Sequence, residues 1–369
     1  MKKVVFAIMT IMSILPSFAQ LNGDGYYRVQ NAMTKRYAYV TDDKGSVNLS
    51  STSADLLAIA LWQDFNKAAS DPSTVFYIKS EGSQYDMTAQ GTGVHAIIGY
   101  YFNIRTNTDG TYFAYASLSG AAKYLGDNEY SSAAKGNLSS EGKGDYRKWY
   151  IKPIKDDDEY YFGFLPTISD ATSNYLSFYA DFGYIPSSTK IKSYYVSTVD
   201  KDMAVLKEIT TAAIPASTPV LVKCESTNVT DNKVTPTKQT VSQPANNLLT
   251  GVYFNNTSVT HNNQVAYNPT TMRILGKLTD GSVGFVKSDI KFIPANTAYL
   301  NVSADTPDEL RLVSETEYVA GVETIQTGTT ATSHAVYSLS GMKVAQSDAH
   351  LSALPAGIYV VGGKKVVVQ

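Results

Sequence analysis

The stretch YFNIRTNTDGTYFAYA, residues 101–116, decides the fold class of this chain. Two short runs rich in aromatic and β-branched side chains flank the turn residues NTDG at 107–110. Asp-Gly between two such runs is among the strongest short-range signals for a β-hairpin. The sequence therefore predicts two antiparallel strands joined by a tight turn at this place.

The same pattern returns elsewhere in the first part of the chain. Each copy predicts a hairpin: YYRV (26–29) with RYAYV (36–40), VFYI (75–78) with QYDM (84–87), and a last copy that begins at KWYI (148–151). Several similar hairpins in one domain are typical of a β-barrel or a β-trefoil. We therefore predict an all-β chain with a β-trefoil-like or barrel-like domain over residues 20–155.

One segment of this region supports two interpretations. SADLLAIALW, residues 53–62, opens with a serine that suits a helix N-cap and continues with good helix formers. The same residues could instead form a strand that ends at Trp62, as in a trefoil repeat. Periodicity does not separate the two over so short a run, so both interpretations stay open.

Tryptophan ends two of the repeated segments, in ALW at 60–62 and in RKW at 147–149. Together with the hairpins, this pattern resembles the ricin-type β-trefoil lectin domains, whose repeats carry Gln-x-Trp. The resemblance implies a trefoil fold for the first domain and sugar binding as its activity.

Residues 156–318 are again rich in strand formers, with Pro, Asn, Asp and Gly between them at short intervals, which is typical of a β-sandwich. Two turns share one pattern, IPASTP at 214–219 and IPANTA at 293–298, and we expect them to form equivalent corners because proline fixes the backbone before strand entry. The predicted strands are 175–182, 192–199, 203–209, 218–223, 283–287 and 297–302.

This central region also resembles part of a group of exported multi-domain β proteins of unknown function from Gram-negative anaerobes. The resemblance implies export and surface display, and it brings no catalytic residues with it. The segments that carry it are ADFGYIPSSTKIKSYYVSTVD (180–200), EITTAAIPASTPVLVKC (208–224), NLLTGVYFN (247–255) and FIPANTAYL (292–300).

The first residues predict export from the cytoplasm. Lys2 and Lys3 precede an apolar run at 4–15, and SFA at 17–19 supplies the small-x-small pattern that signal peptidase needs. We therefore predict a signal peptide over residues 1–19. The apolar run is too short to span a bilayer, so no transmembrane span is expected in the mature chain.

Residues 319–369 predict a linker followed by a small β-meander. The strand runs VYSLSG (336–341), LPAGIY (354–359) and KKVVV (364–368) resemble the C-terminal sorting domain of the type IX secretion pathway. That resemblance implies contact with export machinery and a destination at the outer-membrane surface or outside the cell, with the periplasm as the alternative. A structural cap that covers a sheet edge is the other interpretation of this module.

The sequence contains no signature of a catalytic, metal or cofactor site. The acidic run at 156–159 lacks the glycine and the ligand spacing of a calcium loop. Cys224 lies in an apolar strand-like run, so a buried, inert thiol is predicted. No zinc spacing occurs among the four histidines, which are His95, His261, His334 and His350. We predict no metal and no cofactor.

Charge excludes nucleic acid as a partner. The formal net charge is −2, and it becomes about −4 once Lys2 and Lys3 leave with the signal peptide. Such a balance gives no electrostatic footprint for a phosphate backbone.

Two function classes remain. The first is suggested by the tyrosine content. Tyrosine occurs 27 times against two tryptophans, and a tyrosine-bearing sheet face can bind a glycan or a surface protein. We predict a secreted or surface-displayed, non-catalytic binding or structural protein. The candidate contact residues are Tyr112, Tyr115, Tyr124 and Trp149. Ordinary packing within strands is the alternative for all four.

The second class is an extracellular, glycosidase-like hydrolase. Its two carboxylates would leave no local sequence pattern, because the fold alone brings them together. A pocket that holds two acids above an aromatic floor would favour the enzyme. A flat aromatic patch without acids would favour the binding protein.

Overall fold

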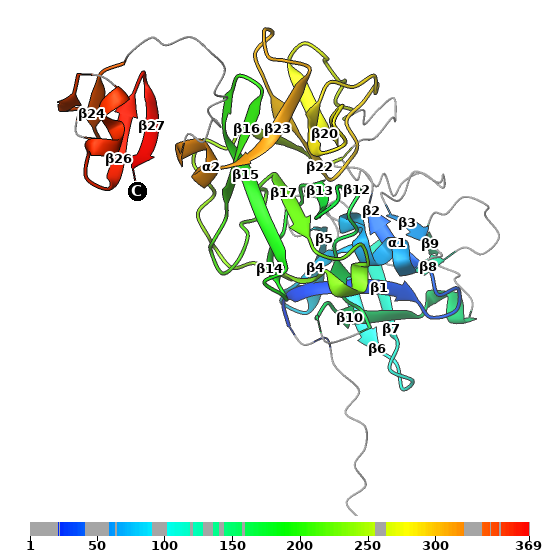
Figure 1. The fold of residues 1–369 in the computed structure, drawn as a ribbon. Helices are drawn as coiled ribbons and strands as arrows, with labels where there is room; N and C mark the ends of the chain where they lie inside the picture. The colour runs from blue at the N-terminus through cyan, green and yellow to red at the C-terminus, as the bar shows by residue number, and fades with distance from the viewer. Residues whose placement is uncertain are drawn as a thin grey trace, which may run out of the picture.

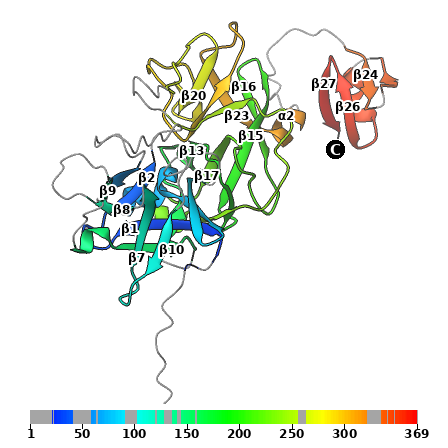
Figure 2. The same cartoon turned by 180° about the vertical axis from the view of Figure 1, so that it is seen from behind.

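The computed structural model describes residues 21, 23–40, 59–62, 65–90, 102–118, 121–127, 136–139, 144–156, 159–254, 263–320, 334–339, 341–346 and 348–368. Strands dominate these ranges, which confirms the all-β prediction (Figures 1 and 2). The predicted signal peptide and the predicted linker at 323–332 lie outside them. The helical segments are all short, namely α1 (Phe65–Ser70), α2 (Glu315–Ala320), η2 (Pro72–Thr74), η3 (Gly144–Arg147), η4 (Val229–Asp231) and η5 (Asp348–Ala353).

Ten strands form the first sheet, and six of them close a ring. Around the ring the neighbours are β1, β10, β7, β6, β5 and β4, and then β1 again. The β5–β6 contact consists of two backbone hydrogen bonds of 2.7 Å between Tyr85 and Phe102. The strands are β1 (Gly25–Asn31), β2 (Tyr37–Val40), β3 (Ile59–Trp62), β4 (Phe76–Glu81), β5 (Gln84–Ala89), β6 (Asn103–Thr106), β7 (Tyr112–Leu118), β8 (Ala121–Asp127), β9 (Gly136–Ser139) and β10 (Trp149–Pro153).

The first region is therefore barrel-like, and the trefoil symmetry stays a prediction. Three of the predicted hairpins are confirmed, because β1 pairs with β2, β4 with β5, and β6 with β7. The fourth copy differs from the prediction. Its strand β10 pairs with β1 and with β7, both earlier in the chain, because these two strands leave an opening in the ring that the last strand fills.

The ambiguous segment ends in a strand. Residues 59–62 form β3, which pairs with β2, so the helical interpretation is wrong for these four residues. The helix α1 begins three residues later, at Phe65. Residues 53–58 lie outside the described ranges.

A hydrophobic core fills the ring. Because successive side chains of a strand point to opposite faces, every second residue of β1, β7 and β10 contributes to it. The buried members include Tyr27, Val29, Phe76, Ile78, Met87, Phe102, Tyr112, Ala114, Leu125, Trp149 and Ile151.

The central region contains a sheet of ten strands and a sheet of three. The three-stranded sheet has the order β11-β18-β14, and the large sheet has the order β12-β13-β17-β15-β16-β23-β21-β20-β22-β19. Their bounds are β11 (Phe162–Gly163), β12 (Ile168–Ser169), β13 (Asn174–Phe178), β14 (Gly183–Pro186), β15 (Ile191–Asp200), β16 (Met203–Glu208), β17 (Val220–Cys224), β18 (Lys233–Thr237), β19 (Leu249–Val252), β20 (Met272–Lys277), β21 (Val283–Val286), β22 (Thr297–Asn301) and β23 (Glu309–Ser314).

The large sheet is built from one four-stranded unit used twice. In the first unit the neighbours run β13-β17-β15-β16, and in the second they run β19-β22-β20-β21. In both, the chain enters the second strand of this order, β17 or β22, through the Ile-Pro-Ala corner that the sequence repeats. Strand β23 lies between the units, parallel to β16 and antiparallel to β21.

The two corners are equivalent, as predicted. Ser217 has a φ of 53° and Asn296 a φ of 56°, so both occupy the left-handed region at the same step of the turn. The amide of Ser217 donates to the carbonyl of Ala180 at 2.9 Å, and that of Asn296 donates to the carbonyl of Val252 at 2.7 Å. Each bond joins a corner to the chain that leaves the first strand of its own unit.

The three-stranded sheet packs on the first unit, so the central region has the two packed sheets of the predicted sandwich, although they are unequal in size. Aromatic rings dominate the layer between them, and Cys224 is fully buried there. Burial raises the pKa of its thiol to about 12, in keeping with the predicted inert cysteine. The rings are those of Phe162, Phe164, Phe178, Phe182 and Tyr184.

The first and central regions contact each other through apolar side chains and through polar groups. Arg28 of β1 is completely buried, and its guanidinium donates twice to the carbonyl of Tyr161, at 3.0 and 2.7 Å. Gln90 follows β5, and its Oε1 accepts from the Asn296 side chain at 3.2 Å. Tyr253 donates to the carbonyl of Ala89 at 3.0 Å.

The C-terminal module has its own four-stranded sheet, drawn in red in Figure 1, with the order β25-β24-β26-β27. A simple meander would place β26 beside β25, whereas here it returns to the other edge of β24. The short helix η5 lies between β25 and β26 in the chain and makes this return. The strands are β24 (Val336–Ser338), β25 (Lys343–Ala345), β26 (Gly357–Val361) and β27 (Lys364–Val368).

Candidate functional site

The four predicted contact residues divide between the inside and the outside of the barrel. Tyr112 and Trp149 lie in its core, with 4% and 0% of their surface exposed. The indole Nε1 of Trp149 donates to the carbonyl of Leu125 at 2.9 Å, and burial raises the pKa of the Tyr112 hydroxyl. Both residues therefore pack as ordinary core side chains, and neither belongs to a ligand site.

Tyr115 and Tyr124 lie on the other face of the same strands. Tyr115 is three residues after Tyr112 on β7, and an odd spacing along a strand reverses the direction of the side chain. Tyr115 is the direct cross-strand partner of Tyr124 on β8. Their ring centroids are 5.1 Å apart, and both residues are partly exposed.

Three further residues complete this face. Phe113, two residues before Tyr115, lies edge-on to the Tyr124 ring at 5.7 Å. Arg105 of β6 is the cross-strand partner of Phe113, and its Cζ lies 5.2 Å from the centroid of that ring. The Arg147 Cζ lies 4.8 Å from the Tyr124 ring and 5.5 Å from the Phe113 ring. We call Arg105, Phe113, Tyr115, Tyr124 and Arg147 the outer aromatic face.

The acidic residues beside this face are already paired with a lysine. Lys148 lies 2.8 Å from Asp109 and 2.9 Å from Asp145. Its hydrogen bond, helped by one from Thr111, lowers the pKa of Asp109 to about 2. Neither Arg105 nor Arg147 has a carboxylate partner among the described residues.

Sequence reasoning found the two tyrosines and missed Phe113, Arg105 and Arg147. The missing signal was the alternation of the predicted strands, since Phe113 shares a parity with Tyr115. The hairpin turn at 107–110 also fixes the register that places Arg105 opposite Phe113. Arg147 has no such signal, because η3 lies outside the strand pattern.

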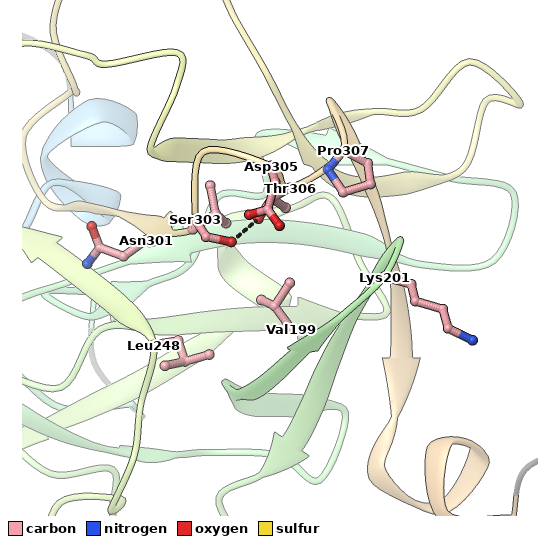
Figure 3. A pocket seen from close by; sticks show the side chains of 9 residues that line it. Val199, Lys201, Leu248, Asn301, Ser303, Asp305, Thr306 and Pro307 are labelled. Carbon is pink, nitrogen blue, oxygen red and sulfur yellow. Dashed lines mark hydrogen bonds between the residues drawn. The ribbon is translucent and has the colours of Figure 1, made fainter.

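The central region contains a pocket of about 430 Å³ (Figure 3). It lies where β15 ends and where the chain passes from β22 to β23. The Lys201 side chain extends away from Asp305 in this view. The lining residues are Val199, Lys201, Leu248, Asn301, Val302, Ser303, Asp305, Thr306 and Pro307.

The chemistry of this pocket differs from that of a glycosidase site. Asp305 is the single carboxylate among its lining residues, and no aromatic ring is among them. A hydrogen bond from the Ser303 side chain lowers the pKa of Asp305, which keeps this carboxyl ionised rather than available as a proton donor. The lining thus lacks both the paired acids and the aromatic floor that a glycosidase would need.

A buried arginine holds one wall of the pocket. Arg273 of β20 is 2% exposed, and its guanidinium donates to the carbonyls of Thr306 and Pro307 at 2.8 and 2.9 Å. It also donates to the carbonyls of Pro269 and Met272 at 2.8 Å each. The chain from β22 to β23 therefore has a fixed course at this point.

The described part of the chain offers no group of three or more His, Cys, Asp or Glu side chains that could hold a metal ion. The acidic run at 156–159 is only partly within these ranges, with residues 157 and 158 outside them. Within the same ranges no helix has the length and apolar character needed to cross a membrane.

No family model and no curated protein matches the chain. A solved structure described as "Structure and mode of action of a mosquitocidal holotoxin" is similar with 12% sequence identity and a TM-score of 0.28, over 78% of this chain and 33% of that chain. This chain thus spans about a third of the toxin chain. At that TM-score the likeness carries no argument about function.

Proposed function

We propose that this chain is a secreted or surface-displayed, non-catalytic protein that binds glycans through its outer aromatic face. The observation that carries the proposal is the contact between the tilted rings of Tyr115 and Tyr124 on the outside of the barrel, extended by Phe113. Rings on a sheet face offer flat apolar area beside polar hydroxyls, which suits a sugar ring that has both kinds of surface.

The position of these rings supports a binding role rather than a structural one. The barrel core already contains Tyr112 and Trp149, so the fold does not need a second aromatic cluster on its outer side. Partly exposed aromatic side chains that gather on one face are typical of interaction sites. The face is also supported by paired strands, so its rings are held in place before a ligand arrives.

We further propose that the signal peptide at 1–19 and the C-terminal module direct the protein out of the cytoplasm. The destination is the outer-membrane surface or the extracellular medium. The C-terminal module contacts the export machinery in this proposal, and the barrel contacts the glycan. The support for this division of roles is the sequence resemblance of the module to type IX sorting domains.

A glycan array followed by calorimetry tests the binding function. The purified protein is screened against neutral and acidic polysaccharides, and the hits are measured with Tyr115→Ala and Tyr124→Ala. We expect each variant to weaken binding about tenfold, since a stacked aromatic contact contributes on the order of 1 kcal/mol or more. Tyr337→Ala, which removes an exposed tyrosine of the C-terminal module, is the matched control and keeps full affinity. Absence of binding to every polysaccharide would overturn the proposal.

A further inference from the structure

The outer aromatic face has two positive charges that nothing in the described structure neutralises. Arg105 is exposed, and Arg147 is partly buried. Neither has an ion-pair partner in the described ranges, although Asp109 and Asp145 lie close by in the sequence. Both of those carboxylates form ion pairs with Lys148. A ligand of the face therefore meets a positively charged surface.

Aromatic rings hold the Arg147 side chain in place. Its guanidinium carbon lies against two rings, those of Tyr124 and Phe113. Its Nε is shielded from solvent and has no hydrogen-bond partner among the described residues. Stacking of this kind fixes the plane of a guanidinium without using an acceptor. Less side-chain entropy is then lost when an anionic group binds.

We infer that the glycan bound by the outer aromatic face is an acidic polysaccharide, whose carboxylate or sulfate groups contact Arg105 and Arg147 while its sugar rings stack on Tyr115 and Tyr124. The inference rests on the proposed function, because it names the ligand class of the same face. A planar guanidinium recognises a carboxylate or a sulfate through two parallel hydrogen bonds, which a neutral sugar cannot accept with the same strength.

A nucleic acid fits this face less well than a polysaccharide. Its backbone carries one charge per nucleotide, and proteins that bind it neutralise many phosphates at once. Among the described residues, two cations of this face lack an ion-pair partner, and the whole chain has a formal net charge of −2. Two fixed cations beside a row of rings suit a polymer in which charged and uncharged sugar surface alternate.

The test compares a sulfated polymer with its desulfated form, and both with other polymers of different charge. Chondroitin sulfate, the same polymer after desulfation, hyaluronate and neutral dextran are titrated into the full chain by calorimetry. A single-stranded oligonucleotide is a further arm. We expect the affinity to be at least about tenfold higher for the charged polymers than for dextran, and to fall as salt is raised. The sulfated and carboxylated arms show which anionic group is preferred.

Variants assign the effect to the two arginines. Arg105→Gln should leave the fold intact because that side chain is exposed. The double variant Arg105→Gln with Arg147→Gln removes both charges. We expect the double variant to lose the preference for charged polymers. Arg147→Lys keeps the charge and removes the stacked plane, so it should lose part of the preference. Arg311→Gln, an equal change of charge on an exposed arginine of β23, is the control.

Each outcome decides between the two proposals. Equal affinity for dextran and the charged polymers, still dependent on Tyr115 and Tyr124, overturns the inference and leaves glycan binding intact. The same holds if the affinity for charged polymers is unchanged in Arg105→Gln and in a folded double variant. Tighter binding of the oligonucleotide than of any polysaccharide overturns the inference in favour of nucleic acid. If no polymer binds, the proposed function itself fails.

Discussion

The Tyr179 ring lies directly against the α-carbon of Gly251, in the space that a Cβ at residue 251 would need. This contact joins the chain that leaves β13 to strand β19, the first strand of the second four-stranded unit. Gly251→Ala should therefore destabilise the central region by about 1–3 kcal/mol, as is usual when a methyl group is added to a packed site. The free energy of unfolding, measured with urea, checks this value.

A double-mutant cycle provides the control for that prediction. Tyr179→Ala removes the ring, so adding Gly251→Ala to it should cost little more than Tyr179→Ala alone. Gly25→Ala in β1 should be nearly neutral, since the nearest atom to its Cβ would be 3.4 Å away. Full additivity of the two central substitutions would contradict the contact.

Arg28 should be the most sensitive arginine of the barrel. Besides the Tyr161 carbonyl, its buried guanidinium contacts the side chain of Thr74 and the carbonyl of Ala69. Arg28→Met takes one donor away from each of these buried acceptors, and a buried group that loses its partner costs about 1–3 kcal/mol. We expect a loss of about 3 kcal/mol or more in the free energy of unfolding. Arg311→Gln should change it by less than about 0.5 kcal/mol because that side chain is exposed.

The folded protein should lose stability above pH 10. Burial raises the pKa of Tyr37 and of Tyr194 to about 12, and raises that of Tyr26 and of Tyr184 well above the ordinary value of 10. A tyrosine with a raised pKa favours the folded state fully below pH 10, and this contribution is lost as pH rises from 10 through the folded-state pKa. Each such tyrosine lowers the free energy of unfolding by about 1.4 kcal/mol per pH unit between pH 10 and its folded-state pKa.

Burial also lowers the pKa of Arg28, but its guanidinium keeps its proton over this pH range and leaves the slope to the tyrosines. Urea unfolding at intervals from pH 8 to pH 11.5 measures the slope. Tyr184→Phe should reduce that slope, and Tyr337→Phe, at an exposed position, should not.

Removal of Arg273 should open the pocket wall and lower stability together. Four carbonyls lose the bonds that Arg273 donates when it becomes Met, among them those of Thr306 and Pro307 in the wall itself. We expect a loss of about 2–4 kcal/mol and faster amide exchange at residues 301–307. Arg273→Lys should recover part of the stability through its remaining donors. Unchanged exchange in Arg273→Met would show that the wall has another support.

The strands could be predicted from local sequence, whereas the pairing of strands that lie far apart in the sequence could not. The hairpin at residues 101–116 has its turn and both strands within one short segment, so its pairing follows from the sequence. Strand β10 is different, because its partner β1 lies more than a hundred residues earlier and nothing local selects it. The duplicated unit was visible only at its Ile-Pro-Ala corners, where proline and a left-handed residue leave a pattern.

The candidate site was predictable to the extent that it follows strand alternation. Tyr115 and Tyr124 are partly exposed, and the parity of Tyr112 places it on the opposite side of β7. Trp149 is buried because its indole has a carbonyl partner inside the barrel. The position of Arg147 depends on how η3 packs against β8, which no pattern within the chain specifies.

Strand β23 is the last strand of the central region to be synthesised, and it is the one that joins the two units. Until Glu309–Ser314 is available, β16 and β21 each keep a row of unpaired backbone groups at an open edge. Such edges are templates for pairing between chains. A nascent or truncated chain that ends before residue 309 therefore has two unpaired strand edges at once, both of which favour aggregation. Insertion of the single six-residue strand β23 pairs both edges.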